Sequence, residues 1–287
     1  MPSPPPPTLV VVDEGPHHAV LVKPAGMTVV GGRGVPRPTL LDLAKERFGG
    51  GVRPVHRIDR VTAGLCVVAK TPFGQQAITE AFRRHLVDKR YLALVEGAPP
   101  WDKRAIDLRL SRIDDPDASH GHKKGPLAWQ TVDEAGVRAL TRVRVLARGQ
   151  GATLVEARPE TGRMHQIRCH LANVGHPIVG DALYGAKLPF PDERAVGLVA
   201  FCVSFPLPHG GRAFVAGPLP EAFVRALAEH GIDPKVVEPL AEKFRRPPPT
   251  PAPPPRRAPD ARPAGRWRGA AGSARSGRGH PGGRRGR

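Results

Sequence analysis

Cysteine and aromatic residues are scarce in this chain. Its 287 residues include three cysteines, and 5% of them are aromatic. Cys66, Cys169 and Cys202 lie far apart and never form a C-x-x-C pair, which excludes a disulfide framework and a cysteine zinc site. We expect three buried thiols in a reducing compartment and a cytoplasmic location. So few aromatic residues give no support to a stacking platform for single-stranded nucleic acid.

The motifs of several other protein classes are also absent. No stretch of 18 apolar residues is present to cross a membrane, and the N-terminus MPSPPPP lacks the basic and apolar regions of a secretory signal. No G-x-x-x-x-G-K-[ST], G-x-G-x-x-G or G-x-S-x-G loop occurs in residues 1–244. His165 and His170 stand five residues apart, which turns them away from each other on a helix and excludes a zinc pair. We therefore expect a reaction that uses neither cofactor nor metal.

Positive charge is what the chain has in excess. The formal net charge is +18. Residues 245–287 contain 12 arginines and one acidic residue, which gives +11, and residues 1–244 carry the remaining +7. Because both parts are basic, we expect a polyanionic partner whose phosphates supply affinity rather than specificity. For residues 245–287 alone, solubility is an equally good explanation.

Composition and periodicity divide the chain into three regions. Residues 1–8 are rich in proline and residues 245–287 in proline, arginine and glycine, so we expect both to be disordered. Residues 9–244 are predicted to form one domain. Its strands are expected within 8–13, 18–30, 65–69, 89–97, 139–149, 152–160, 198–205 and 212–217, and its helices within 39–50, 71–86, 161–177, 220–232 and 234–246. Residues 98–127 are polar and rich in turn residues. This order favours an α+β domain, with helices flanking a mixed, mostly antiparallel sheet.

One carboxylate stands among cations just before the apolar run 65–69. In VHRIDRVTAGLCVVAKT (55–71), an extended backbone puts Arg57 and Asp59 on one side and Ile58 on the other. A partly buried carboxylate must be paired or neutral, and adjacent cations favour its ionised form and lower its pKa. An ionised, fixed Asp59 suits a nucleophile or an electrostatic stabiliser. A salt bridge that holds a loop in place is the alternative.

Four stretches together resemble one protein family. They are VLVKPAGMTVV (20–30), HRIDRVTAGLCVVAKT (56–71), KRYLALVEG (89–97) and GRMHQIRCHLANVGHPIVGDALYG (162–185). They are similar, in the same order, to the opening Lys-Pro-Ala-Gly segment, the aspartate motif, the tyrosine motif and the third motif of the RluA-type family of RNA pseudouridine synthases. The resemblance runs from about Leu9 to about Pro218 and implies the pseudouridine synthase fold.

The resemblance also implies a reaction and its residues. Enzymes of this family break the N1–C1′ bond of a uridine in RNA and rejoin the base through C5, with no cofactor or metal. Asp59 matches the catalytic aspartate, which either attacks the sugar or abstracts a proton from it. Arg168 matches the arginine that pairs with this aspartate. Tyr91 matches the tyrosine that stacks on the uracil and helps to remove the C5 proton.

Three more residues are expected to contact the RNA. Arg57 matches the family arginine that helps to displace the target base from its stack. We interpret His56 and Arg60 as residues that fix the loop or contact phosphates. The chain departs from the family pattern at Ala63, where a serine is usual. Met164 stands where a small hydroxyl residue is usual, and Val143 where a tyrosine is frequent; these changes concern packing and substrate preference.

The partner expected from the resemblance is a structured RNA, either transfer or ribosomal, with no membrane partner and a monomeric enzyme. The similarity begins by about Leu9, which leaves no room for an N-terminal S4-type RNA-binding module and favours transfer RNA or small stem-loops. The basic residues 245–287 would then add RNA affinity. The alternative is a catalytically inactive protein of the same fold that binds or folds RNA.

Overall fold

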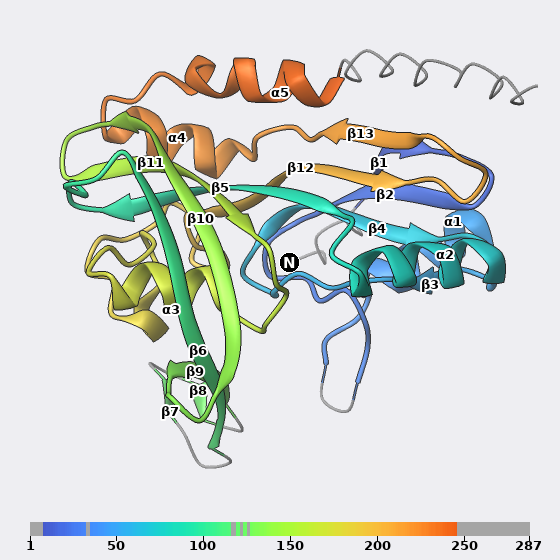
Figure 1. Ribbon diagram of the computed structural model, residues 1–287, viewed down its shortest axis with the longest axis horizontal. Coiled ribbons are helices and arrows are strands. Elements are labelled where there is room, and N and C mark those ends of the chain that lie inside the picture. Colours follow the sequence, from blue (N-terminus) through green and yellow to red (C-terminus); the bar gives the residue numbers. More distant parts are fainter. Residues whose placement is uncertain (1–7, 33–34, 116–118, 121–122, 125–126, 246–287) are drawn as a thin grey trace, which may run out of the picture. The chain divides into compact units, whose positions relative to one another are not determined.

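One mixed sheet forms the centre of the domain, and the helices pack against it (Figure 1). The computed structural model describes residues 8–32, 35–115, 119–120, 123–124 and 127–245. Within these residues, nine strands lie in the order β1-β2-β4-β12-β5-β11-β10-β6-β9, β3 pairs with β4, and β13 pairs with β12. Of the strand pairs described, β12 with β4 is parallel and the others are antiparallel. This arrangement confirms the predicted α+β class.

The bounds of the elements follow the chain. The strands are β1 (Val10–Glu14), β2 (His18–Lys23), β3 (Arg53–Pro54), β4 (Ala63–Ala69), β5 (Asp88–Glu96), β6 (Lys103–Asp115), β7 (Ser119–His120), β8 (Lys123–Lys124), β9 (Leu127–Val132), β10 (Val137–Arg148), β11 (Ala152–Pro159), β12 (Leu198–Pro206) and β13 (Arg212–Ala216). The α-helices are α1 (Leu40–Phe48), α2 (Pro72–Arg83), α3 (Gln166–Asn173), α4 (Glu221–Glu229) and α5 (Glu238–Arg245), and two short 3-10 helices are η1 (Ala182–Tyr184) and η2 (Pro234–Val237).

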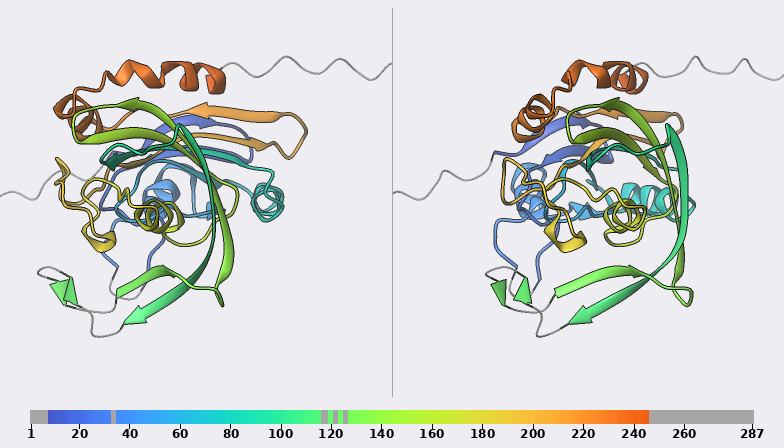
Figure 2. Two further views of the ribbon diagram at one scale, coloured as in Figure 1. Left: turned by 60° about the vertical axis from the view of Figure 1, so that its left-hand side comes forward. Right: turned by 90° about the vertical axis from the view of Figure 1, so that its left-hand side faces the viewer.

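The helices cover both faces of the sheet, as Figures 1 and 2 show. Because side chains alternate along a strand, the two faces of β5 belong to different cores. Leu92 and Leu94 lie in the core that α4 and α5 cover. Ala93 and Val95 lie in the core that α3 covers. Tyr91 lies on the same face of β5 as Ala93 and Val95. Since both faces of β5 pack in a core, the strand that carries Tyr91 is buried on both sides.

Local capping chemistry begins two of the predicted helices. The Thr39 side chain accepts the Asp42 N–H, and the Asp42 carboxylate accepts the Thr39 N–H, so α1 starts with a capping box. The Thr71 hydroxyl accepts the Gly74 N–H at 3.1 Å, and Pro72 occupies the first helical position of α2. The helices expected within 39–50 and 71–86 are thus confirmed.

Two details of the sequence analysis were wrong. The turn-rich segment expected over 98–127 contains β6, which pairs with β10 along eight residues. The charged side chains of β6 suggested a loop. On the strand they form ion pairs with the neighbouring strand, such as Arg138 with Asp107 at 2.6 Å. The helix expected over 161–177 begins only at Gln166, because His165 adopts the left-handed conformation at φ 50°. Residues 161–165, which include Thr161, therefore lie in a loop and not on the expected helix.

The structure does not test the predictions made for residues 1–8 and 245–287. Apart from Thr8 and from Arg245, which ends α5, the segments 1–8 and 245–287 lie outside the described residues. The described helices include none with the length and apolar character that a membrane crossing requires.

Gly64 is required where the parallel strands β4 and β12 meet. Its φ is +111°, and a Cβ at this position would lie 2.3 Å from the carbonyl oxygen of Ala200. Gly64→Ala should therefore lower the free energy of unfolding by at least about 3 kcal/mol, from overpacking together with backbone strain. Chemical denaturation measures this. Gly50→Ala is the control, since nothing lies within 4 Å of a Cβ built at that position. Equal stability of the two variants would show that the close approach of β4 and β12 does not require a glycine at position 64.

Candidate active site

All six residues singled out from the sequence line one cavity. It has a volume of about 880 Å³ and opens between the loop before β4, the start of β5 and the start of α3. Asp59, Tyr91 and Arg168 line it, and so do His56, Arg57 and Arg60. Among the described lining residues, Asp59 is the only carboxylate and Tyr91 the only tyrosine.

The loop before β4 presents Asp59 as the alternation predicted. Ile58 is 8% exposed and packs in the core beside α1, while Arg57 and Asp59 face the cavity. The Asp59 carbonyl accepts the Thr62 N–H at 3.1 Å, which turns the chain into β4. The loop is thus anchored by a buried apolar side chain and by the strand that follows it.

A second carboxylate, Asp181, holds Arg168. The Arg168 Nε and Nη2 donate to the two oxygens of Asp181, each at 2.7 Å, and both side chains are almost fully buried. The remaining Nη1 lies 3.8 Å from the Asp59 carboxylate, which is an ion-pair distance and too long for a hydrogen bond. Arg168 therefore does pair with Asp59, as the resemblance implies, while its position is set by Asp181.

Burial dominates the electrostatics of Asp59. It raises the pKa of Asp59 above the ordinary range, although Arg168, Lys23 and Arg57 act in the opposite direction. The expectation that adjacent cations would lower this pKa was wrong, because it did not include the cost of removing the carboxylate from water. The backbone N–H of His165 donates to Asp59 and, like the cations, favours the ionised form.

Tyr184 supports the same corner of the cavity. The Arg168 guanidinium carbon lies 5.1 Å from the centre of the Tyr184 ring. The Tyr184 hydroxyl accepts the Gln130 N–H from β9 at 2.9 Å and contacts Nδ1 of His165 at 3.1 Å. Burial, followed by the charge of Arg168, lowers the pKa of His165 to about 3. The His165 ring is therefore neutral at physiological pH, and its Nδ1 can accept the hydroxyl proton.

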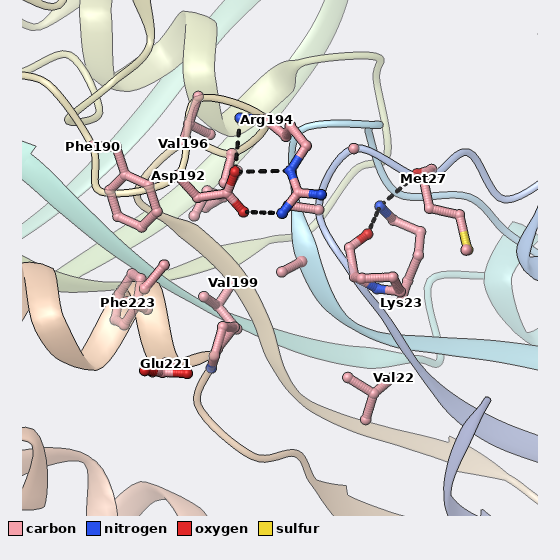
Figure 3. Close-up of a pocket in the computed structure, with 18 of the residues that line it drawn as sticks. Val22, Lys23, Met27, Phe190, Asp192, Arg194, Val196, Val199, Glu221 and Phe223 are labelled. Atoms are coloured by element: carbon pink, nitrogen blue, oxygen red, sulfur yellow. Dashed lines mark hydrogen bonds and ion pairs between the residues drawn. The ribbon is translucent and has the colours of Figure 1, made fainter. Parts of the chain in front are cut away.

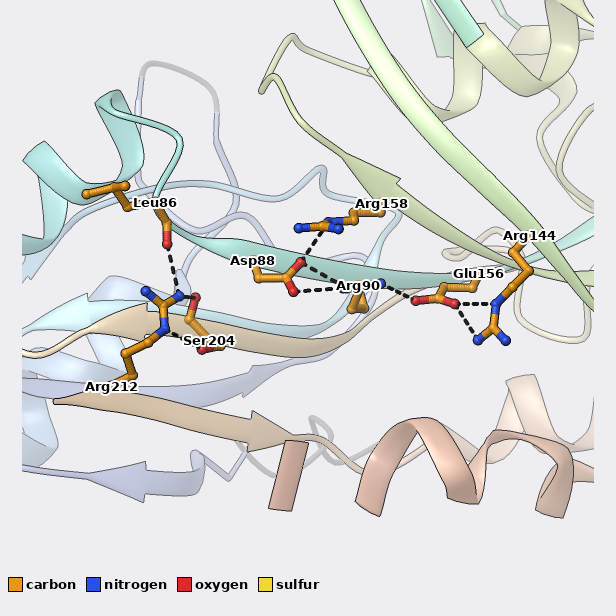
Figure 4. A network of polar contacts seen from close by, with 8 residues as sticks. All are labelled: Leu86, Asp88, Arg90, Arg144, Glu156, Arg158, Ser204 and Arg212. Carbon is orange, nitrogen blue, oxygen red and sulfur yellow. Dashed lines mark hydrogen bonds and ion pairs between the residues drawn. The ribbon is translucent and has the colours of Figure 1, made fainter. Parts of the chain in front are cut away.

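Tyr91 reaches the cavity from β5. Burial and the nearby charge of Asp59 raise the pKa of its hydroxyl above the ordinary value, so the phenol is protonated at neutral pH. From the other face of β5, Arg90 forms ion pairs with Asp88 at 2.8 Å and with Glu156 of β11 at 2.7 Å (Figure 4). Glu156 also pairs with Arg144 of β10, so three strands are tied together behind the tyrosine.

The three expected RNA-contact residues differ in environment. Arg57 and Arg60 are exposed, and their side chains form no hydrogen bond or ion pair within the described residues. His56 instead accepts the Val67 N–H through Nε2 at 2.9 Å and stacks on Phe82. Burial, followed by the charge of Lys89, lowers the pKa of His56 to about 3. His56 thus fixes the loop, and its neutral ring is a poor phosphate ligand.

Lys23, in the Lys-Pro-Ala-Gly segment, connects two loops. Its ammonium donates to the carbonyls of Pro24, Met27 and Arg60 at 2.9, 2.7 and 3.2 Å, two of which appear in Figure 3. Burial lowers the pKa of Lys23 to about 8. This lysine holds the segment after β2 against the Asp59 loop, a role that the sequence analysis did not assign.

A larger cavity lies elsewhere in the domain. It has a volume of about 1120 Å³ and extends from the end of β2 to α4 (Figure 3). Neither Asp59, Tyr91 nor Arg168 lines it, and its Asp192 carboxylate is paired with Arg194 at 3.0 Å. The smaller cavity, which joins a buried carboxylate to unpaired arginines, is the better candidate for chemistry.

Sequence reasoning missed Asp181 and Tyr184 as parts of this site. Both stand in the segment IVGDALYG (178–185), which belongs to the third motif, but neither was assigned a role in the site; Asp181 is typical of a turn. It does make that turn, since its carbonyl accepts the Tyr184 N–H at 3.0 Å. The signal that was available is an acidic residue 13 positions after an arginine expected to be buried, since a buried guanidinium needs a partner.

Comparisons with known proteins agree with the geometry. The sequence model of the RNA pseudouridylate synthase family matches residues 17–173. A protein of Zymomonas mobilis named as an uncharacterized RNA pseudouridine synthase is 37% identical over 210 residues, which are 71% of this chain and 90% of that protein. A ribosomal large subunit pseudouridine synthase D of the same organism is 35% identical over 195 residues, 62% of this chain, and the match spans only 56% of its length.

Solved structures are similar as well. Human RNA Pseudouridylate Synthase Domain Containing 1 aligns over 77% of this chain and 87% of its own, with a TM-score of 0.60 and 25% identity. Human RNA Pseudouridylate Synthase Domain Containing 4 aligns over 78% and 93%, with a TM-score of 0.62 and 23% identity, a likeness of fold.

The raised pKa of Asp59 predicts a cost in stability. A carboxyl whose pKa is raised by folding destabilises the folded state once the pH exceeds its unfolded value of about 3.9. Asp59→Asn should therefore be more stable than the wild type at pH 7, and the difference should disappear near pH 4. Urea denaturation at both pH values measures this. A variant that is less stable at pH 7 would show that the cations outweigh burial.

The Arg168–Asp181 pair predicts a contrast between two aspartates. Asp181→Asn should lower the free energy of unfolding by about 3–5 kcal/mol, because a buried guanidinium loses its charged partner. Asp192 makes a similar contact with Arg194, whose side chain is 76% exposed, so Asp192→Asn should cost less than about 1 kcal/mol. Denaturation of the two variants under the same conditions gives the comparison. Similar costs would mean that Asp181 is not the anchor of Arg168.

Proposed function

This chain belongs to the RNA pseudouridylate synthase family, whose members isomerise uridine in RNA to pseudouridine, and we propose that Asp59 is its catalytic carboxylate. The observation that carries the proposal is the composition of the 880 Å³ cavity, in which Asp59 is the only carboxylate among the described lining residues. A reaction that needs one carboxylate in this cavity can use no other residue there.

The isomerisation conserves every atom of the uridine. The N1–C1′ bond breaks, a C5–C1′ bond forms, the C5 proton leaves, and N1 gains a proton. An ionised Asp59 serves either of two first steps, attack on C1′ or abstraction of a proton from the sugar. Arg168, Lys23 and Arg57 favour that ionised form.

Tyr91 is proposed as the stacking partner of the uracil. Its ring lines the same cavity as Asp59. Because burial raises the pKa of the hydroxyl, little phenolate is present at neutral pH. This favours a role for the ring face over removal of the C5 proton by the phenolate.

Arg57 and Arg60 are proposed to receive the RNA at the cavity mouth. A uridine in a helix or loop must leave its stack to reach a buried carboxylate, at a cost of about a few kcal/mol. An exposed arginine without an ion-pair partner is available to occupy the vacated place or to bind the adjoining phosphates. Arg57, two residues before Asp59, is nearest in the chain for the first role.

We propose a transfer or ribosomal RNA as the substrate. The net charge of +18 supports a polyanion. A ribosomal substrate is named for the synthase D relative, of which this chain covers 56%. A protein of this fold that only binds RNA is the alternative that the experiment must exclude.

The decisive experiment maps pseudouridine across total RNA with a chemical label, in cells with and without the gene. One or a few sites should disappear on deletion and return with the wild type. Asp59→Asn should return none of them, because it removes the only carboxylate among the described lining residues, while it still binds the same RNA in a filter assay. Asp192→Asn, a carboxylate outside the cavity, is the control and should restore every site.

Two results would reject the proposal. A pseudouridine map that is unchanged on deletion, with all expressed RNAs covered, favours the protein that only binds RNA. Restoration of the sites by Asp59→Asn would mean that Asp59 is a structural ion-pair residue and that the reaction uses another group.

A further inference from the structure

Two lysines, the fully buried Lys23 and the partly buried Lys89, differ in how their ammonium groups are satisfied. Lys23 has three carbonyl acceptors, one for each of its protons. Lys89 donates to one acceptor within the described residues, the carbonyl of Thr161 at 3.2 Å. Two of its N–H donors are therefore left without a protein partner, and Lys89 lines the 880 Å³ cavity. Lys23 holds two loops together, whereas two N–H donors of Lys89 remain available to a ligand.

Lys89 also lacks a carboxylate partner. No described acidic group lies within ion-pair distance of its ammonium, in contrast to Arg90 beside it. Asp88 is the acidic neighbour that affects Lys89, and its carboxylate is engaged by Arg90 and Arg158 on the opposite face of β5 (Figure 4). Even a partly buried cation is costly when it has no counter-charge. Such a cation at a cavity wall is a site for an anion.

The other charges around the cavity favour an anion over a cation. Arg83, which ends α2 and pairs with Glu80, lines the same cavity, and so do His85, Arg163 from the loop after β11 and Arg57 from the loop before β4. His56, also from the loop before β4, is neutral. Asp59, which lies at the Arg168 end, is the only carboxylate among the described lining residues. The Lys89 end of the cavity thus presents only cationic or neutral groups.

The spacing to Tyr91 suggests which anion fits. Lys89 and Tyr91 are two residues apart on one face of β5, so their Cα atoms are separated by about 6.6 Å along the strand. A base that stacks on Tyr91 carries its sugar toward Asp59 and its backbone phosphates further along the cavity. We propose that Lys89 binds an RNA backbone phosphate next to the uridine that enters this cavity, which makes it a substrate-binding residue of the reaction. This rests on the proposed function, which places the uracil on Tyr91.

The charge of Lys89 is sensitive to pH. Burial lowers the pKa of Lys89 to about 8, and a bound phosphate shifts it upward again by favouring the ammonium form. Below this range the lysine is charged and binds the phosphate. As the pH rises above about 8, the proton is lost and the contact disappears. An arginine at this position would remain charged throughout.

The experiment compares Lys89→Gln, Lys89→Arg and the control Lys45→Gln, an exposed lysine of α1 outside the cavity. The probe is the RNA in which the pseudouridine map finds the site. For Lys89→Gln, KM should rise about tenfold with kcat changed by less than about twofold. The slope of log affinity against log salt should become shallower by roughly 0.7–0.9, the value for one phosphate contact. Lys45→Gln should match the wild type.

Lys89→Arg separates a phosphate contact from a structural role. At pH 7 it should restore the affinity and the salt slope. Between pH 7 and pH 9 the wild type should lose affinity while Lys89→Arg does not, and Lys23, which also titrates near pH 8, is common to both proteins and cancels. Thermal unfolding should find Lys89→Gln at least as stable as the wild type, because an unpaired buried charge is removed.

The failures of the two proposals can be told apart. If the wild type forms pseudouridine and Lys89→Gln keeps its KM and salt slope, the phosphate contact is wrong and the proposed function stands. A loss of kcat and stability that Lys89→Arg does not restore also overturns the contact, in favour of a packing role. If the wild type neither binds nor modifies any RNA, the proposed function fails, and this inference fails with it.

Discussion

The contact of Arg168 with Asp181 is the interaction on which the geometry of the cavity depends. A guanidinium offers its donors in a rigid planar fork, and Asp181 takes the Nε–Nη2 edge at 2.7 Å for both bonds. This leaves only Nη1 toward Asp59, at 3.8 Å. One carboxylate therefore orients and largely neutralises the arginine, and the other receives an orienting charge without being locked to it. Tyr184, over the guanidinium, closes the remaining side.

The looseness of the Asp59 contact has a chemical consequence. A carboxylate held by two short hydrogen bonds, as Asp181 is, has its lone pairs engaged and its charge stabilised, so it is a poor nucleophile or base. Asp59 lies near the same cation but is destabilised by burial, which raises its pKa. His165, whose left-handed backbone supplies a further N–H to Asp59, adds local strain at the same place. The strained backbone of His165 and the destabilised charge of Asp59 thus lie together, as is typical of functional sites.

The sequence was informative where the signal was local. Alternation around Ile58 placed Asp59 on the cavity side, and the helices expected within 39–50 and 71–86 begin at their capping residues. Tyr91, Arg57 and Arg168 were identified through family motifs, which carry three-dimensional information that composition does not. The contact of Asp181 with Arg168 was missed because it depends on how the segment after α3 folds back. The pKa of Asp59 was misjudged because burial depends on every element around the cavity, whereas the cations are visible in four residues of sequence.

The positive charges of this chain differ in whether a carboxylate lies beside them, and the sequence alone does not show which of them are paired. Many arginines of the sheet are matched by carboxylates across the strands, as Arg138 is by Asp107 and Arg144 by Glu156, so these pairs hold the strands in register and offer little to a polyanion. Around the cavity the matching is incomplete, although Arg83 pairs with Glu80 and Arg168 with Asp181. Arg57, Arg60 and Arg163 have no ion-pair partner among the described residues, and Lys89 has one carbonyl for three protons. Net charge alone predicts that the chain attracts RNA; the pairing of each cation determines where the RNA can bind. Because a partly buried cation with one carbonyl acceptor and no counter-charge is costly, a ligand that supplies the missing negative charge would stabilise Lys89 at this cavity.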